Sequence, residues 1–230
     1  HETKSNIENL KNEIIFLIFL SLHCNNINQE EASRLWSLIC KNILSKIFHN
    51  YLSTKYKDYK KYFFVIGMGK IGVKDLNFTS DIDLIIFFDS KNSPYELYEF
   101  NKSIKTLIGN ISNISPTFFH KIDLRLRPDL GNSFIVTDME DAIDYYSSIG
   151  RNWERLAFYR SCFLCGDISL YYNFKSSISS FLFRRSFDYY AIDEVKKLFS
   201  VKHESKLLDI KNSYGFIRSC ENILHFNQLL

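Results

Sequence analysis

Residues that interrupt helices are scarce in this chain, which has three prolines and eight glycines among 230 residues. Its five cysteines are odd in number and scattered, which argues against a disulfide framework and favours a reducing compartment. The only strongly apolar run, residues 14–22, has roughly half the length that spans a bilayer. The net charge of +3 is too small to indicate a nucleic-acid partner. These absences predict a cytoplasmic protein without nucleic-acid or membrane partners.

The rest of the composition is that of an ordinary globular protein, with 46% hydrophobic and 24% charged residues. Residues 6–25 and 29–56 contain neither proline nor glycine and are predicted to be helical, and a helical pattern returns from Asp138 onward. We therefore expect an α+β fold with a small mixed sheet between two groups of helices. The predicted segments are 1–57, 58–135 and 136–230.

Strands are expected only in the middle segment, where short runs rich in β-branched and aromatic residues occur. The predicted strands are 62–67, 81–89 and 118–127. A crossover helix is expected within 94–112, and Asp138 is expected to cap the helix that follows it. The motif "CFLC" at 162–165 has no second cysteine pair and no nearby histidine, so it predicts two buried thiols on a helix rather than a metal site.

A glycine turn follows the first predicted strand, because Gly67, Gly69 and Gly72 have the spacing G-x-G-x-x-G. This spacing occurs in dinucleotide-binding turns, which require a full helix between the turn and the next strand. Here the next predicted strand already begins at Asp81, and no crossover helix fits before it. Asp89 lies at the distance of the ribose-binding acid, but it ends a strand beside no helix. The dinucleotide interpretation is therefore disfavoured.

Paired aspartates favour a different chemistry. Side chains alternate along a strand, so Asp81 and Asp83 would share a face with their Cα atoms roughly 6–7 Å apart, while Ile82 and Leu84 point into the core. Asp123 lies in the neighbouring predicted strand. Carboxylates are preferred ligands of Mg²⁺, and three of them would hold two ions for phosphoryl or nucleotidyl transfer.

Groups suited to phosphate surround these acids in the sequence. Gly67 and Gly69 let backbone N–H groups approach phosphate oxygens, Lys70 adds a positive charge, and Ser80 offers a hydroxyl beside the metal. Residue chemistry thus indicates that these four residues lie around a phosphate group and the metal.

Arg125 and Arg127 would share the face of Asp123 by the same alternation, and arginine binds phosphate with two donors. The purely structural alternative is that the two aspartates begin a strand and that the "RLRP" stretch is a solvated edge. The glycine turn before the pair and the third acid after it favour the metal site.

The glycine turn, the D-x-D pair and the distal aspartate resemble the nucleotidyltransferase superfamily that includes polymerase-β-type enzymes. Three longer blocks resemble the family of bifunctional glutamine synthetase adenylyltransferase/adenylyl-removing enzymes. They are "GMGKIGVKDLNFTSDIDLI", "KIDLRLRPDLG" and "YYSSIGRNWERLAFYRSCFLCGD". Members of this family contain two catalytic halves, and Met68, "NF" at 77–78 and "GRNWER" at 150–155 resemble the amino-terminal, adenylyl-removing half.

The resemblance implies an enzyme that removes AMP from a glutamine synthetase tyrosine by phosphorolysis and releases ADP. It implies Asp81, Asp83 and Asp123 as metal ligands, with two Mg²⁺ ions and ADP or ATP bound nearby. Glutamine synthetase would be the protein substrate, and a nitrogen-signalling regulatory protein is a further implied partner. Glu154 and Arg155 match the W-E-R block, where a structural salt bridge is at least as plausible as a catalytic role.

Two alternatives stay open at this point. The same metal geometry would serve an adenylyltransferase that attaches AMP from ATP to glutamine synthetase. The block "KNSYGFIRSCEN" at 211–222 departs from the glycine-rich block of the family, which favours a domain that binds nucleotide or glutamine synthetase without turnover.

Overall fold

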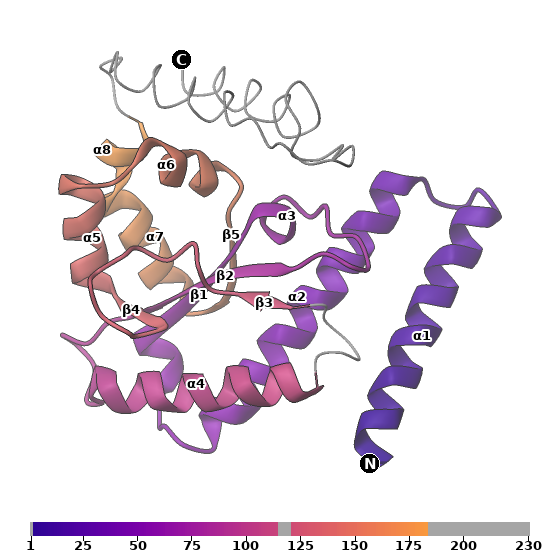
Figure 1. Ribbon diagram of the computed structural model, residues 1–230, viewed down its shortest axis with the longest axis horizontal. Helices are drawn as coiled ribbons and strands as arrows, with labels where there is room; N and C mark the ends of the chain where they lie inside the picture. The colour runs from indigo at the N-terminus through magenta and orange to yellow at the C-terminus, as the bar shows by residue number, and fades with distance from the viewer. Residues whose placement is uncertain (1, 115–120, 184–230) are drawn as a thin grey trace, which may run out of the picture.

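Two long helices open the chain in the computed structural model, which describes residues 2–114 and 121–183. Helix α1 spans Glu2–His23 and packs along α2, Gln29–Ser53, as Figure 1 shows. Asn28 and Glu31 form a capping box in which each side chain accepts a backbone N–H of the other, at 2.9 and 2.8 Å. The predicted helices over 6–25 and 29–56 are confirmed.

Strands β1 (Phe63–Met68) and β2 (Ile82–Phe88) form the centre of the sheet and are antiparallel. A one-turn 3₁₀ helix, η1 (Tyr59–Tyr62), precedes β1, and the four-residue helix α3 (Gly69–Gly72) follows it. A dinucleotide-binding unit requires parallel strands joined by a full helix. The antiparallel pair therefore excludes that interpretation, as the short gap after Gly72 predicts.

Parallel strands extend the outer edge of β2. Helix α4 (Leu97–Ile114) is the predicted crossover, and it leads to β3 (Ile122–Asp123), which is parallel to β2. Strand β4 (Val136–Asp138) lies parallel to the other end of β2. The strand predicted over 118–127 is wrong in length, because only two of its described residues pair with β2. Residues 118–120 lie outside the described part.

The fifth strand comes from the region that was expected to be helical. Strand β5 (Cys162–Gly166) pairs antiparallel with β1 and closes the sheet order β3-β2-β1-β5. It contains Cys162 and Cys165, so the prediction that "CFLC" lies on a helix is wrong. Both thiols are free, and burial raises the pKa of Cys165 to about 12.

Four further helices cover the second face of the sheet. They are α5 (Met139–Ser148), α6 (Asn152–Tyr159), α7 (Ile168–Ser177) and α8 (Ser179–Leu182). Asp138 caps α5 by accepting from the backbone N–H groups of Glu140 and Asp141, at 2.9 and 3.2 Å, as predicted. The block at 211–222 lies outside the described residues.

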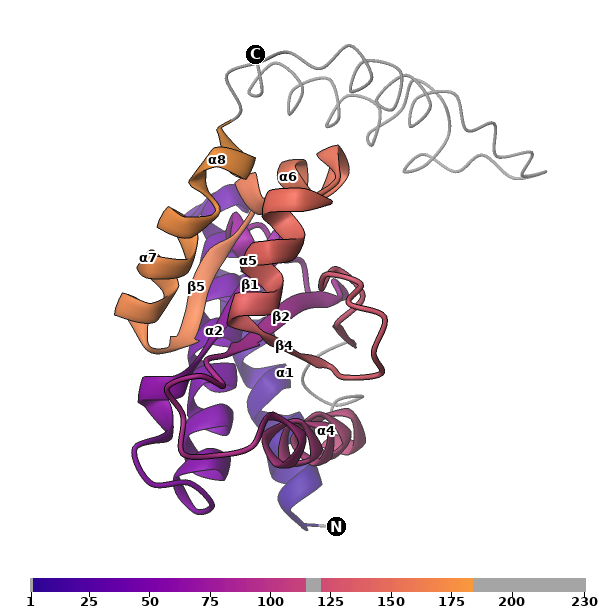
Figure 2. The same cartoon turned by 90° about the vertical axis from the view of Figure 1, so that its left-hand side faces the viewer.

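Helices lie on both faces of the sheet (Figure 2), and the strands are buried between two hydrophobic cores. Alternate residues of β1 and β2 contribute to two different cores. The core on the α2 and α4 side takes Phe63, Val65, Ile82, Leu84, Ile86 and Phe88. The core on the α5 and α7 side takes Phe64, Ile66, Met68, Ile85 and Phe87. Burial on both faces explains why the two strands are continuous apolar runs, and the architecture confirms the predicted α+β class with a small mixed sheet.

None of the helices in the described ranges combines the length and the apolar character needed to cross a membrane.

Candidate active site

The glycine turn lies against a carboxylate. Gly69 follows β1 with a φ of +59°, which side-chain-bearing residues rarely adopt. A Cβ atom at Gly69 would lie 2.8 Å from Oδ2 of Asp83, because Met68 and Asp83 are register partners across β1 and β2. Glycine is thus required here for its backbone conformation and for the space that the Asp83 side chain fills.

Asp83 and Asp123 are brought together by the sheet. They are register partners on the parallel strands β2 and β3, so their Cα atoms lie on neighbouring strands about 4.8 Å apart and their side chains leave the same face. Ile82 and Leu84, which alternate with Asp83, enter the core on the opposite face as predicted. Two of the three predicted acids therefore meet beside the glycine turn.

Asp81 differs from its neighbour in position. Strand β2 begins at Ile82, so Asp81 precedes the strand and its side chain is exposed. Strand pairing therefore does not determine the face on which the Asp81 side chain lies, and its placement beside Asp83 stays a prediction. Within residues 2–114 and 121–183, no group of three or more acids, histidines or cysteines is close enough to hold a metal ion.

Arg125 binds the carboxylate of Asp123. Its Nε donates to both carboxylate oxygens, at 3.0 and 2.8 Å, its Nη2 donates to Oδ2, and its backbone N–H donates to Oδ1 at 2.9 Å. These hydrogen bonds lower the pKa of Asp123, against the opposing effect of burial. Asp123 and the neighbouring carboxylates of Asp83 and Asp81 in turn raise the pKa of Arg125. The guanidinium thus lies within the electrostatic reach of all three predicted acids.

The contact arises through a turn rather than through strand alternation. Strand β3 ends at Asp123, and Arg125 follows in a turn. Arg127 does not extend toward the acids: it donates to the carbonyl oxygens of Leu124 and Phe134, at 2.8 and 2.9 Å. In this structure Arg127 therefore holds the loop between β3 and β4, whereas Arg125 lies in the site.

Of the other residues predicted to face phosphate, Lys70 lies next to the turn glycine, whereas Gly67 and Ser80 have packing and loop contacts. Lys70 follows Gly69 in α3 and is half-buried. Gly67 lies inside β1, where a Cβ atom would be 2.9 Å from Cγ2 of Ile71, so its small size serves packing. The Ser80 hydroxyl donates to Oδ1 of Asn77 at 2.6 Å and thereby shapes the loop before β2.

Asp83 and Asp123 suit a single Mg²⁺ ion. In proteins Mg²⁺ is usually bound by one or two carboxylates together with phosphate oxygens and water. The two register-paired carboxylates supply that donor set, and the cation that Arg125 already places on Asp123 demonstrates that this position accommodates positive charge. A nucleotide phosphate would complete the coordination.

Glu154 and Arg155 belong to a different part of the molecule. Glu154 is buried in α6 and accepts from the Tyr145 hydroxyl at 3.0 Å and from the backbone N–H of Arg151 at 2.8 Å. Burial raises the pKa of Glu154. Nε of Arg155 donates to the carbonyl oxygen of Leu182 at 2.8 Å. Both residues hold helices together, which favours the structural role considered for the W-E-R block.

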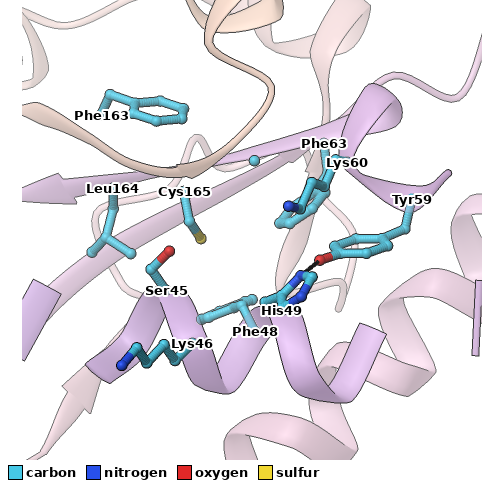
Figure 3. Close-up of a pocket in the computed structure, with 11 residues that line it drawn as sticks. Ser45, Lys46, Phe48, His49, Tyr59, Lys60, Phe63, Phe163, Leu164 and Cys165 are labelled. Carbon is cyan, nitrogen blue, oxygen red and sulfur yellow. Dashed lines mark hydrogen bonds between the residues drawn. The ribbon is translucent and has the colours of Figure 1, made fainter. Parts of the chain in front are cut away.

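A cavity of about 300 Å³ lies beside the start of β1, at the end of the strand opposite to the glycine turn (Figure 3). It opens beside Phe63, the first residue of the strand, whereas Gly69 follows the last. His49 and Tyr59 are hydrogen-bonded at its rim, and Lys60 and Cys165 also line it. The lining residues come from α2, η1, β1 and β5, so no local motif in the sequence marked this cavity. Phe63, which lines the cavity, pairs with Phe88, whereas Asp83 pairs with Met68 at the other end of the six-residue strand β1.

Known proteins match the chain along most of its described length. The family described as "Glutamate-ammonia ligase adenylyltransferase" matches residues 9–177, more than half of the chain. Relatives named bifunctional glutamine synthetase adenylyltransferase/adenylyl-removing enzyme occur in Agrobacterium fabrum, Bartonella henselae and Rhizobium meliloti. Their identities to this chain are 34% over 148 residues, 33% over 157 and 32% over 180.

These matches cover 62%, 66% and 72% of this chain but only 15%, 16% and 18% of the respective relatives. The chain thus spans less than a fifth of the length of the curated relatives that it matches. The matched residues include the glycine turn, the three predicted acids Asp81, Asp83 and Asp123, and the W-E-R block. The chain therefore belongs to the glutamate–ammonia ligase adenylyltransferase family.

Proposed function

We propose that this domain removes AMP from an adenylylated tyrosine of glutamine synthetase by Mg²⁺-dependent phosphorolysis and releases ADP. The observation that carries the proposal is the position of Asp83 and Asp123 on adjacent strands, directly beside the Gly69 turn. Carboxylates next to a backbone that approaches phosphate are suited to nucleotidyl transfer. Membership of the family supplies the substrate class.

In the proposed reaction Asp83 and Asp123 would hold the cation, and Asp81, which precedes β2, would have to move toward them to serve as a third ligand. The bound ion would supply positive charge at the phosphoryl oxygens and align the reactants. An oxygen of inorganic phosphate forms a bond to the AMP phosphorus, and the bond from that phosphorus to the tyrosine oxygen breaks. The proton of the attacking phosphate passes to the tyrosine, so the products are ADP and unmodified tyrosine.

The chain's own groups orient this reaction. The Gly69 backbone approaches the phosphates without a side chain in between, and Lys70 contributes a positive charge from the next position. Gly67 and Ser80 support the turn and the loop that carry these groups, and Arg127 supports the loop after β3. Two Mg²⁺ ions, as implied by the family, would require Asp81 to move toward the other two acids.

Removal is preferred to attachment because of sequence resemblance alone. Met68, the "NF" pair at 77–78 and "GRNWER" at 150–155 are similar to the amino-terminal half of the family. Attachment of AMP from ATP is the alternative reaction at the same site. Glutamine synthetase is the proposed protein partner in both cases, a nitrogen-signalling protein is the proposed regulator, and the proposed location is the cytoplasm.

The proposal is tested by ADP release from adenylylated glutamine synthetase with phosphate and Mg²⁺. We expect ADP from the parent chain and a loss of about a thousandfold in Asp83→Asn, because the substitution removes one ligand charge from the metal site. The matched control is Asp144→Asn, which makes the same carboxylate-to-amide change at an exposed position of α5 and should retain activity.

Three outcomes distinguish the candidate functions. ADP that depends on Asp83 supports removal of AMP. Pyrophosphate release from ATP and unmodified glutamine synthetase, without ADP production from the adenylylated form, supports attachment instead. Nucleotide binding with neither product supports a domain without turnover and contradicts the proposed function.

A further inference from the structure

Arg125 lies between a buried carboxylate and solvent. The Asp123 side chain is 5% exposed, whereas the Arg125 side chain that covers it is 81% exposed. Both oxygens of Asp123 accept hydrogen bonds from Arg125. The guanidinium therefore closes the solvent side of the carboxylate that the proposed function assigns to Mg²⁺.

The Arg125 guanidinium and a divalent cation would compete for the Asp123 carboxylate. Each carboxylate oxygen has two lone pairs, and Arg125 uses both on each: Oδ1 accepts from Nε and the backbone N–H, and Oδ2 accepts from Nε and Nη2. A Mg²⁺ ion can therefore bind only by displacing at least one of these donors. Because the incoming cation takes the place of the exposed guanidinium, the buried carboxylate keeps a positively charged partner during the exchange. Arg125 and the ion would therefore exchange with each other on the oxygens of Asp123.

We propose that Arg125 is a positioning residue that holds Asp123 in the metal-free state, competes with the divalent cation for it, and moves onto a nucleotide phosphate when the cation binds. The proposal rests on the assignment of Asp123 as a metal ligand in the proposed function. It assigns Arg125 two successive anionic partners, a carboxylate and then a phosphate, both of which suit its planar pair of donors.

Arg127 provides a matched control for the competition. It carries the same charge two residues away, but its donors bind the backbone carbonyls of Leu124 and Phe134. Removing either arginine lowers the local positive charge by one. Of the two substitutions, removal of Arg125 is the one that takes away the donors to the Asp123 oxygens. A difference in Mn²⁺ affinity between the two variants therefore separates the loss of that contact from the loss of one positive charge.

The first measurement is Mn²⁺ binding without nucleotide, by electron paramagnetic resonance of the free ion. We expect Arg125→Ala to bind Mn²⁺ about fivefold more tightly than the parent chain, which is the effect of removing a competing exposed ion pair. Arg127→Ala should show a smaller gain, and Arg125→Lys should fall between parent and alanine variant because lysine keeps the charge without the two-donor contact.

The second measurement is ADP affinity in the presence of saturating Mn²⁺, by calorimetry. Here Arg125→Ala should bind ADP more weakly than the parent chain, because the displaced guanidinium no longer reaches a phosphate. A merely structural role for Arg125 would not move the affinities for the ion and for the nucleotide in opposite directions.

Equal Mn²⁺ affinities of Arg125→Ala and the parent chain, or equal gains in both arginine variants, would overturn the inference. If ADP release by the parent chain still depends on Asp83, the proposed function survives that result. A parent chain that binds no Mn²⁺ and releases no ADP would overturn both.

Discussion

Two buried acids in different regions of the molecule have opposite electrostatics. Asp123, at the edge of the sheet, is 5% exposed and Glu154, in α6, is 3% exposed. Asp123 is bound by a guanidinium and its pKa is lowered, whereas Glu154 is bound by a hydroxyl and a backbone N–H and its pKa is raised by burial. Burial alone therefore does not separate a site carboxylate from a structural one. The partners of the carboxylate do.

The proposed function gives this difference in pKa a physical origin. A carboxylate that binds a cation must stay ionised and must be reachable from solvent through a group that moves. The exposed Arg125 side chain donates to both oxygens of the buried Asp123 carboxylate. Glu154 instead satisfies the Tyr145 hydroxyl and the first turn of α6, which are fixed groups. The comparison predicts that substitutions at Asp123 mainly reduce ADP release, whereas substitutions at Glu154 mainly reduce the free energy of unfolding.

The largest expected effect is on catalysis by the sheet-edge acid. Asp123→Asn should reduce ADP release from adenylylated glutamine synthetase about a thousandfold, since it removes a ligand charge. Its free energy of unfolding should change by less than about 1 kcal/mol, because the lost ion pair involves an exposed guanidinium. Steady-state ADP release and chemical denaturation measure the two quantities.

Glu154→Gln is the reciprocal variant, and it should retain ADP release per folded molecule. A large loss of activity in Glu154→Gln with unchanged stability would break the comparison, because it would place Glu154 in the reaction.

The second expected effect is on stability in the helical region. Glu154→Ala leaves the Tyr145 hydroxyl and the Arg151 backbone N–H without their acceptor, and should lower the free energy of unfolding by about 3 kcal/mol. The matched control is Glu140→Ala. Glu140 forms an exposed ion pair with Lys91 at 2.6 Å, and its removal should cost less than about 1 kcal/mol. Equal losses in urea denaturation would contradict the structural assignment of Glu154.

A third, smaller effect concerns the glycine turn. Gly69→Ala should lower the free energy of unfolding by about 1–2 kcal/mol, because its φ of +59° is unfavourable for alanine, and should also displace the Asp83 carboxylate. Gly109→Ala serves as the control: Gly109 lies in α4 with nothing within 4 Å of its added Cβ atom. That variant should gain about 0.5–1 kcal/mol.

Thermal unfolding and ADP release of both glycine variants test this prediction. Full activity of Gly69→Ala would show that the turn does not need the close approach to Asp83.

Much of the fold was predictable because local chemistry determines it. The Asp138 cap, the helices without proline or glycine, and the continuous apolar run of β2 each depend on neighbouring residues. Strand β5 does not follow from the sequence because "CFLC" lies between helical patterns and carries no alternation: Leu164 and Cys165 enter one core, Phe163 packs against the other, and the register with β1 is irregular. Its pairing with β1 involves residues about a hundred positions apart.

The candidate site was predictable in part for the same reason. Asp83 follows from strand alternation and Gly69 from the turn spacing, and both lie where the sequence indicates. Arg125 and Arg127 were given one role, yet they have different partners. The turn after β3 directs Arg125 to the carboxylate two residues before it, and Arg127 binds a carbonyl seven residues ahead. The difference between the partners of the two arginines depends on the geometry of the loop after β3, which no local sequence pattern predicts.

The smallest expected effect is the pH dependence of stability, which sharpens the comparison. The folded pKa of Asp123 lies below its unfolded value, so its contribution to stability is fully present above about pH 4 and is lost as the pH falls through the folded pKa. The folded pKa of Glu154 lies above its unfolded value, so its contribution is fully present below about pH 4 and is lost as the pH rises through the folded pKa.

Thermal unfolding between pH 3 and 7 in metal-free buffer, in about half-unit steps, compares each variant with the parent chain. The deficit of Asp123→Asn should shrink toward the acid end, because the parent loses its ion pair there. Glu154→Gln should gain relative to the parent as the pH rises, since only the parent must ionise a buried acid. Each effect is about 1.4 kcal/mol per unit of pKa shift. Slopes of the same sign would show that the two carboxylates share one kind of environment, and the distinction between the regions would fail.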